Sequence, residues 1–150
     1  MEKDDVKMAV TALKEGTVID HIPAGKLFKV VDIMNLYEYK KTLRMGMYLN
    51  SKTYGKKDLL KIEDRYLTQE EANRIALIAP NATINIIKDW KVAKKIKVSL
   101  PDVITGLKCA NPRCITRHDH IKTKFIVMDK KTLKVRCHYC EHVFEKEEII

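Results

Sequence analysis

Four cysteines lie in the last third of the chain, in two closely spaced pairs. Cys109 and Cys114 are separated by four residues, Cys137 and Cys140 by two, and 22 residues separate the pairs. Two turns that each present two thiolates can hold one Zn²⁺ ion in a tetrahedral site. Two disulfides and buried free thiols are the alternatives, and a reducing cytosol disfavours the disulfides. The spacing predicts a Cys₄ zinc site, and because it leaves no open coordination position, we expect this zinc to be structural.

Two histidines near the first cysteine pair, His118 and His120, are alternative ligands. With four cysteines available, we interpret them as solvated loop residues. The segment "CHYC" is followed by Glu141 rather than by a histidine, which excludes a haem-attachment motif. A structural zinc can contribute about 10 kcal/mol to the folding of a small module. Cys₄ ribbons bind either protein or nucleic acid, and the spacing does not choose between these partners.

A second chemical signal is the pair Asp20-His21, which ends the apolar run of "GTVIDHIPAG". The pair could be catalytic, two metal ligands, a polar strand end or part of a ligand-recognition edge. Neighbouring residues of a strand point to opposite faces, which argues against a catalytic dyad. The chain has five glycines and contains no GxSxG, Walker loop, GxGxxG or HExxH motif. We therefore expect no enzyme activity.

A nucleotide site can also be built without a glycine-rich loop. It would use backbone groups at strand edges for the base, a carboxylate for the ribose and cationic side chains for the phosphates. Lys61 interrupts the apolar run "LLKIE", Asn85 interrupts "TINII", and Lys95 follows the only tryptophan. Each residue alone is typical of an exposed strand position. Their occurrence together with Asp20 and His21 on several strands of one sheet raises the nucleotide hypothesis.

The first half of the chain contains alternating strand and helix patterns. The β-branched segment 17–22 predicts a strand, and segments 42–50 and 56–64, joined by turn residues 50–55, predict a hairpin. A helix is predicted from a first turn at Pro23 to about Tyr37. Its apolar stripe would be Leu27, Val30, Val31 and Met34. The alternation in 42–50 would place on one face Leu43, Met45, Met47 and Leu49.

A second helix is predicted from the capping box of Thr68 and Glu71 to the residue before Pro80. Strands are expected at 82–87 and 91–100, the latter added at an edge. The order strand, helix, strand, strand, helix, strand predicts a ferredoxin-like antiparallel sheet with both helices on one face.

The segment "SLPD" (99–102) marks a boundary, so we expect one domain over residues 1–100 and another over 101–150. The second contains the β-rich segments 124–129 and 133–137 and no helical stripe. A domain of about fifty residues buries only a small apolar core and needs a cross-link for stability. The bound metal would supply that cross-link. The expected fold class is α+β, a ferredoxin-like antiparallel sheet with two helices followed by a small all-β Cys₄ zinc-binding domain.

The chain carries 29 basic and 20 acidic residues, a net charge of +9, which favours phosphate-bearing partners. The start "MEKDDVKM" has no secretory signal, and no apolar run approaches the ~18 residues of a membrane span. We expect a cytoplasmic protein with no membrane partner.

Four segments together resemble the regulatory chain of aspartate carbamoyltransferase: "GTVIDHIPAG", "GKKDLLKIED", "IALIAPNATINII" and "LKCANPRCI…VRCHYCEHVF". The resemblance runs from about Val10 to Phe144. It implies a non-catalytic subunit whose allosteric domain, residues 1–100, binds CTP, ATP and UTP. It also implies that residues 101–150, with one structural Zn²⁺ per chain, dock onto catalytic chains that make carbamoyl aspartate in pyrimidine biosynthesis. Regulatory chains would pair as homodimers through the allosteric domain.

The resemblance further implies a role for each residue of a nucleotide site. Asp20 would hold the ribose, and His21 and Lys95 would face the phosphates. The backbone that reads the base would be that of Val10, Thr11, Ala12 and Leu13. Lys61 would lie close to the ribose and Asn85 close to the phosphates. The pocket would be lined by Ile87, Trp90 and Val92.

The main alternative is a basic zinc-ribbon protein that binds nucleic acid, with the sheet as a platform. Residues 101–150 carry only ten basic side chains against seven acidic ones. The predicted sheet also lacks a run of exposed aromatic residues for base stacking. We therefore expect no nucleic-acid partner. A nucleotide-sensing adaptor for some other enzyme would share every residue-level feature and differ only in its partner.

Overall fold

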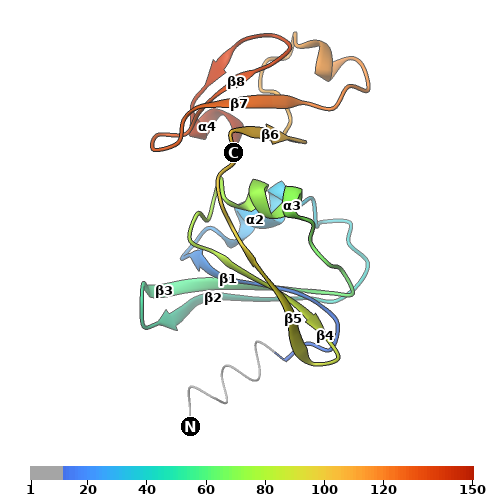
Figure 1. The fold of residues 1–150 in the computed structure, drawn as a ribbon, viewed down its shortest axis with the longest axis vertical. Helices are drawn as coiled ribbons and strands as arrows, with labels where there is room; N and C mark the ends of the chain where they lie inside the picture. The colour runs from blue at the N-terminus through green and yellow to red at the C-terminus, as the bar shows by residue number, and fades with distance from the viewer. Residues whose placement is uncertain (1–11) are drawn as a thin grey trace. The chain divides into compact units, whose positions relative to one another are not determined.

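The computed structural model describes residues 12–150 and divides the chain after Val98 into two units. The first unit is built on a five-stranded antiparallel sheet with the order β2-β3-β1-β4-β5. The strands are β1 (Gly16–Pro23), β2 (Leu43–Ser51), β3 (Gly55–Glu63), β4 (Thr83–Lys88) and β5 (Lys91–Lys97). Two helices of the described part, α2 (Leu27–Ile33) and α3 (Gln69–Ile75), lie on the same side of this sheet (Figure 1). The ferredoxin-like arrangement is confirmed, with β5 added beside β4.

The core of the first unit lies between the sheet and its helices. Ile19 pairs with Leu60 on β3 and with Ile84 on β4, and all three side chains are fully buried. The helices contribute Leu27 and Ile75, which are equally inaccessible. Each such side chain stabilises the fold by about 1.5–3 kcal/mol relative to an exposed one.

Helix α2 begins four residues later than predicted. Pro23 stays in β1, where it pairs with Lys57, so it does not form the first helical turn. The helix begins at Leu27 because a buried carboxylate on β3, that of Asp58, accepts hydrogen bonds from the backbone N–H groups of Gly25 (2.8 Å) and Leu27 (3.1 Å). These donors have no partner within the helix, and Asp58 satisfies them from a distant strand.

The same helix ends at Ile33 rather than near Tyr37. Asn35 adopts a left-handed conformation, with φ of 52°. The N–H of Leu36 then bonds to the carbonyl of Val31 at 3.1 Å, and both side chains are buried. This is the Schellman termination, in which a left-handed residue turns the chain back over the last helical turn.

The predicted apolar face of β2 is also wrong. The register shifts between Gly46 and Leu49, and Tyr48 takes a positive φ of 58°. This β-bulge forms where the carboxylate of Asp58 accepts a hydrogen bond from the backbone N–H of Tyr48 at 2.9 Å. A bulge interrupts the two-residue alternation, so Leu49, which pairs with Lys57, lies on the opposite face from Leu43 and Met45.

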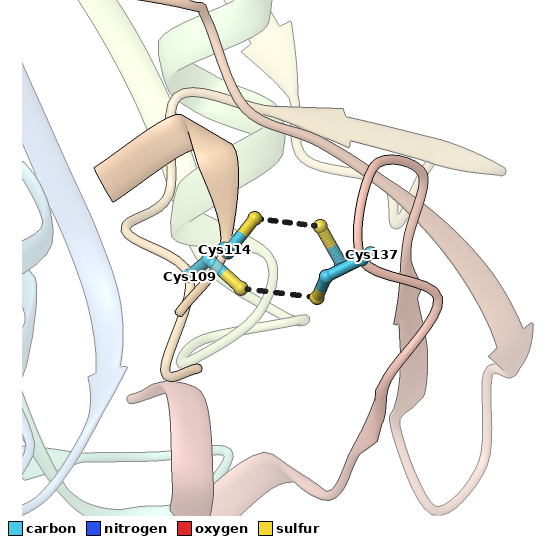
Figure 2. Close-up of side chains that lie close together, drawn as sticks. Cys109, Cys114 and Cys137 are labelled. Carbon is cyan, nitrogen blue, oxygen red and sulfur yellow. Dashed lines mark hydrogen bonds between the residues drawn. The ribbon is translucent and has the colours of Figure 1, made fainter. Parts of the chain in front are cut away.

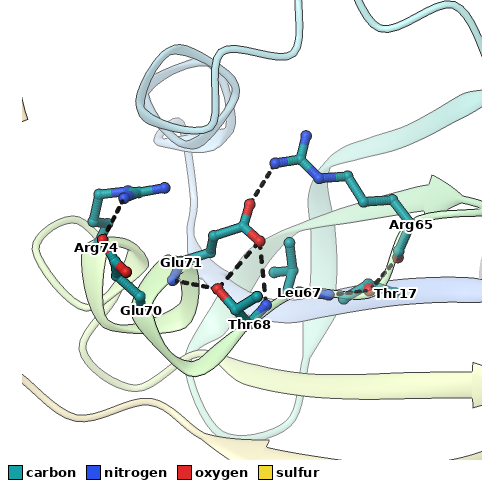
Figure 3. A network of polar contacts seen from close by, with 7 residues as sticks. All are labelled: Thr17, Arg65, Leu67, Thr68, Glu70, Glu71 and Arg74. Atoms are coloured by element: carbon teal, nitrogen blue, oxygen red, sulfur yellow. Dashed lines mark hydrogen bonds and ion pairs between the residues drawn. The ribbon is translucent and has the colours of Figure 1, made fainter. Parts of the chain in front are cut away.

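Helix α3 begins with the predicted capping box of Thr68 and Glu71, which is confirmed (Figure 3). It ends at Ile75, earlier than predicted, because the chain tightens into i→i+3 bonds such as that from the N–H of Ile78 to the carbonyl of Ile75. The predicted strand over 91–100 ends at Lys97. The other predicted strand bounds agree with the structure within one residue.

The second unit, Ser99–Ile150, contains a four-stranded antiparallel sheet with the order β6-β7-β8-β9. Its strands are β6 (Val103–Thr105), β7 (Lys124–Asp129), β8 (Lys134–Cys137) and β9 (Val143–Phe144). Its helical parts are one 3₁₀ turn, η1 (Ile115–Arg117), and the four-residue α4 (Lys146–Ile149). Phe125 and Val135 are fully buried, but the apolar core is small. The α+β fold class is confirmed. No helix over residues 12–150 is long and apolar enough to cross a membrane.

Candidate metal centre and ligand-binding face

The four cysteines converge in the second unit. Cys109 and Cys114 lie on the loop between β6 and β7, Cys137 ends β8, and Cys140 lies in the turn that follows. Their four Sγ atoms lie within 4.8 Å of one another. The Cys109–Cys140 and Cys114–Cys137 Sγ distances are both 3.8 Å. Figure 2 shows how the side chains of Cys109, Cys114 and Cys137 lie close together. A tetrahedral ion with metal–sulfur bonds of about 2.3 Å requires sulfur separations of ~3.8 Å, so the four thiols fit a single zinc-sized ion.

Local backbone bonds hold both cysteine turns. The N–H of Cys114 bonds to the carbonyl of Asn111 at 3.0 Å, and the N–H of Glu141 bonds to the carbonyl of Cys137 at 2.9 Å. The guanidinium of Arg117 donates to the carbonyl of Cys109 at 2.8 Å. The sequence folds into two short turns here, and each turn orients its sulfurs toward the other.

The cysteine cluster disfavours four thiolates unless a cation is present. Burial raises the pKa of Cys109 to about 12 and also raises the pKa of Cys137. Burial acts in the same direction on Cys140, but hydrogen bonds from the side chain of Asn111 and the backbone of His142 outweigh it and leave that pKa at about 6. A bound divalent ion would supply the charge that keeps all four sulfurs deprotonated.

The two loop histidines lie outside this cluster. The group of possible ligands that the described residues bring together consists of the four cysteines alone. His118 is exposed, and its Nε2 lies 2.9 Å from the carbonyl of Pro112. His120 is exposed as well.

In the first unit, the sheet register aligns three predicted site residues in one row across the strands. Lys61 pairs with Val18, Val18 pairs with Asn85, and Asn85 pairs with Lys95. Arg44 on β2 completes the row as the partner of Lys61. Directly paired residues share a sheet face, so these polar side chains lie on one face, with Val18 of β1 between Lys61 and Asn85. We call this face, which is the one away from Ile19 and Leu60, the polar-row face.

The neighbouring rows add other predicted residues to the polar-row face. Asp20 pairs with Thr83 on one side of the row, and Gly16 pairs with Ile87 on the other. Ile87 in turn pairs with Val92, which is half exposed. Asp20, Ile87 and Val92 are therefore displayed on the same face as Lys61 and Asn85.

Asp20 and His21 occupy a β-bulge in β1. The register shifts between Ile19 and Ile22, and His21 has a left-handed φ of 59°. The Asp20 carboxylate accepts a hydrogen bond from the backbone N–H of His21 at 2.7 Å and pairs with Lys57 at 2.9 Å. The imidazole instead lies 3.0 Å from the hydroxyl of Thr83. The carboxylate and the ring thus have different partners, so the pair has no dyad geometry.

Lys61 is buried beneath the segment that precedes β1. Its side chain is 1% exposed, and its Nζ donates to the backbone carbonyl of Ala12 at 2.7 Å. The guanidinium of Arg44 reaches the same carbonyl at 3.4 Å. Burial, with a smaller contribution from the charge of Arg44, lowers the pKa of Lys61 to about 8. Leu13 packs against the same face in a small cluster with Val18 and Ile87.

A pocket of about 280 Å³ lies at the end of the polar-row face. It is lined by Ala12, Leu13, Lys14, Glu15, Arg44, Glu63, Asp64 and Trp90. Three of these are predicted site residues, and the side chain of Trp90 is 63% exposed. The lining does not include Asp20, His21 or the polar row apart from Arg44. Two further predicted residues, Val10 and Thr11, lie outside the described residues.

Sequence reasoning missed three side chains that contact the predicted residues. Lys57 pairs with Asp20, Thr83 contacts His21, and Arg44 shares the Ala12 carbonyl with Lys61. The turn at 52–54 alone would place Met45 opposite Lys61, and the bulge between Gly46 and Leu49 brings Arg44 there instead. Lys57 and Thr83 follow from the bulge in β1, for which the sequence carries no signal.

Comparison with known proteins gives a full-length match. A family model described as aspartate carbamoyltransferase regulatory chain, allosteric domain, matches residues 8–99, and one described as the metal binding domain of the same chain matches residues 101–150. The aspartate carbamoyltransferase regulatory chain of Pyrococcus abyssi is 54% identical over 147 residues, which cover 96% of this chain and 97% of the relative. The protein of the same name in Bacteroides thetaiotaomicron is 45% identical over 150 residues, with 99% and 98% covered.

Proposed function

Because the chain belongs to the family of aspartate carbamoyltransferase regulatory chains, we propose that it carries nucleotide control to the catalytic chains of that enzyme. The chain is itself a non-catalytic subunit, in a complex of pyrimidine biosynthesis. Its first unit, residues 1–100 by our assignment, binds nucleoside triphosphates such as CTP, ATP and UTP. Its second unit, residues 101–150, docks onto catalytic chains.

The observation that carries the nucleotide site is the alignment of Lys61, Asn85 and Lys95 in one row of the polar-row face. In the proposed complex, Lys95 and His21 face the phosphates and Asn85 lies beside them. Asp20 holds the ribose hydroxyls, close to Lys61. Asp20 sits one strand from Asn85 and is already ion-paired with Lys57. Hydrogen bonds from a charged donor such as Lys95 to a phosphate oxygen are stronger than those between neutral groups.

The base is assigned to the backbone of residues 10–13 and to the side chains beside it. Ala12 and Leu13 line the pocket together with Trp90. Ile87 and Val92 supply apolar surface in the adjoining row of the sheet. Backbone groups and flat apolar walls are typical of base-binding pockets.

We assign one structural Zn²⁺ per chain to the four cysteines, supported by sulfur separations that match a tetrahedral thiolate site. When bound, the ion supplies folding free energy on the order of 10 kcal/mol to a unit with a small apolar core. The cysteine turns are thereby held in the shape that docks onto a catalytic chain.

Two first units associate in the proposed assembly, so that the regulatory chain is a homodimer. Nucleotides shift the activity of the catalytic chains through their different affinities for two states of the assembly. A difference of 1–3 kcal/mol, roughly 5- to 150-fold in affinity, is sufficient for such control.

The nucleotide proposal can be tested with the sole tryptophan. We expect Trp90 emission of the zinc-loaded chain to change saturably with CTP, ATP or UTP, and the change to be lost in Lys95→Ala. Lys52→Ala, which removes an exposed lysine from the β2–β3 turn, is the matched control and should bind normally. A short RNA serves as competitor. Tight, salt-dependent RNA binding without a triphosphate response would contradict the proposal and favour the nucleic-acid alternative.

A further inference from the structure

The carboxylate of Glu15 joins two loops that are distant in sequence. Its Oε2 accepts a hydrogen bond from the hydroxyl of Tyr66, in the segment between β3 and α3. Its Oε1 accepts a hydrogen bond from the backbone N–H of Asp89, in the β4–β5 turn, at 3.0 Å. We call these three residues the Glu15 clasp. One side chain thus ties the segment before β1 to the chain that follows β3 and to the chain that follows β4.

Backbone bonds reinforce the clasp. The N–H of Trp90 donates to the carbonyl of Lys14 at 3.1 Å, and the N–H of Asp64 donates to the carbonyl of Glu15 at 3.0 Å. Residues 14–15 therefore hold the β4–β5 turn on one side and the end of β3 on the other. Four hydrogen bonds converge on two residues, which fixes the path of the chain immediately after Leu13.

The turn that the clasp holds has an unfavourable backbone for its sequence. Asp89 and Trp90 have φ values of 50° and 67°, the arrangement of a two-residue type I′ turn. Asp tolerates the left-handed region, whereas a bulky residue such as Trp rarely adopts it. Such conformations persist where surrounding contacts determine them. Here those contacts are the hydrogen bonds that the N–H groups of Asp89 and Trp90 donate to the Glu15 carboxylate and the Lys14 carbonyl.

The surroundings keep the clasp charged. The hydrogen bond from Tyr66, then that from Asp89, lowers the pKa of Glu15, and the nearby charges of Lys14 and Lys88 act in the same direction. The ammonium of Lys88 also lies 5.0 Å from the centre of the Tyr66 ring. A charged acceptor makes the stronger hydrogen bonds, so the clasp is expected to hold throughout the neutral range.

The clasp lies at the pocket assigned to the base. Glu15 and Trp90 both line it, as do Ala12 and Leu13. We propose that Glu15 is a positioning residue for nucleotide binding, which fixes the backbone of residues 12–15 and the Trp90 turn in the geometry that the base requires. This inference rests on the proposed nucleotide function and adds to it a residue that need not touch the ligand.

The test compares variants of the full-length, zinc-loaded chain. Calorimetry measures triphosphate affinity, and acrylamide quenching measures the exposure of Trp90 without nucleotide. Glu15→Ala removes both acceptors, Tyr66→Phe removes one donor, and Glu15→Gln keeps an acceptor for Asp89. Thr68→Ala is the matched stability control, because it removes the cap of α3, away from the pocket. Urea unfolding is recorded for each variant.

We expect Glu15→Ala to weaken triphosphate binding about tenfold through lost preorganisation. Trp90 should become easier to quench, and Glu15→Gln should recover most of the affinity. Tyr66→Phe should lie between these two, and Thr68→Ala should bind normally despite its lower stability. Wild-type affinity in Glu15→Ala, or an unchanged Trp90 signal, would overturn the inference. Failure of the proposed function is a different result, in which the wild-type chain itself binds no triphosphate.

Discussion

The ammonium group of Lys61 on β3 donates a 2.7 Å hydrogen bond to the backbone carbonyl of Ala12, 49 residues earlier in the chain. The side chain is 1% exposed, so a cation is buried against a carbonyl dipole rather than against a carboxylate. Burial and, secondarily, Arg44 lower its pKa from 10.5 to about 8. Lys61 thus holds to the sheet the segment that we assign to base recognition. Burial of its ammonium group carries a desolvation cost, which disfavours the charged form.

This arrangement predicts a pH dependence of stability. Between pH 8 and 10.5 the unfolded chain keeps the Lys61 proton, whereas the folded chain has lost part of it. Stability therefore rises with pH across that window because the unfolded state binds more protons. Urea midpoints at pH 7.5, 8.5 and 9.5 should rise more for the wild type than for Lys61→Met. Identical slopes for the two proteins would contradict the lowered pKa.

Gly16 is predicted to be irreplaceable at the start of β1, directly after residues 12–15, which line the pocket. A Cβ there would overlap the backbone carbonyl oxygen of Ile62, and its φ of 142° lies in a region that favours glycine. Gly16→Ala should lower the free energy of unfolding by about 2–4 kcal/mol. Gly25→Ala is the control, since its φ is 87° but no atom lies within 4 Å of the added Cβ. That change should cost only about 1–2 kcal/mol, and equal costs would argue against the clash.

Asp58 is predicted to be a structural carboxylate that organises the start of α2 and the bulge in β2. It is fully buried and accepts three backbone N–H groups, those of Gly25, Leu27 and Tyr48. Asp58→Asn replaces one acceptor with a donor, so stability should fall by about 1–3 kcal/mol. The control Asp64→Asn loses only an exposed contact with Lys41 at 3.4 Å, worth under about 1 kcal/mol. Equal urea midpoints for the two variants would contradict the role of Asp58.

Metal removal should unfold the second unit selectively. A chelator at acidic pH should release one zinc per chain, because protons compete for thiols such as Cys109, whose pKa burial raises to about 12. In a ¹H–¹⁵N spectrum, signals of residues 99–150 should lose dispersion while those of the sheet that contains Lys61 and Asn85 remain. Cys114→Ser should act like the chelator. A metal-free chain with an unchanged spectrum would show that the cysteines need no ion.

The features that the sequence predicted well depend on local spacing. The cysteine pairs, the capping box of Thr68 and Glu71, and the strand pattern each occupy a short window. The errors involve partners from elsewhere in the chain. Asp58 sets the start of α2 and the bulge in β2 from a third strand, and Asn35 ends the helix with a left-handed turn that its apolar stripe does not indicate.

The candidate site shows the same division. The residues Asp20, Lys61, Asn85 and Lys95 could be proposed from the sequence, and the register places them on one face. The contacts that shape this face span larger separations. Glu15 contacts Asp89, 74 residues later in the chain. The sequence around Glu15 has no pattern that distinguishes it from a solvent-exposed glutamate.

The most direct test of regulatory function is the rate of carbamoyl aspartate formation by aspartate carbamoyltransferase catalytic chains reconstituted with this chain. We predict that at least one of CTP, ATP and UTP changes the rate saturably. The response should disappear with Lys95→Ala, although that variant still docks. Docking of the wild-type chain with a rate that no triphosphate changes would contradict its role as a nucleotide-controlled regulatory chain.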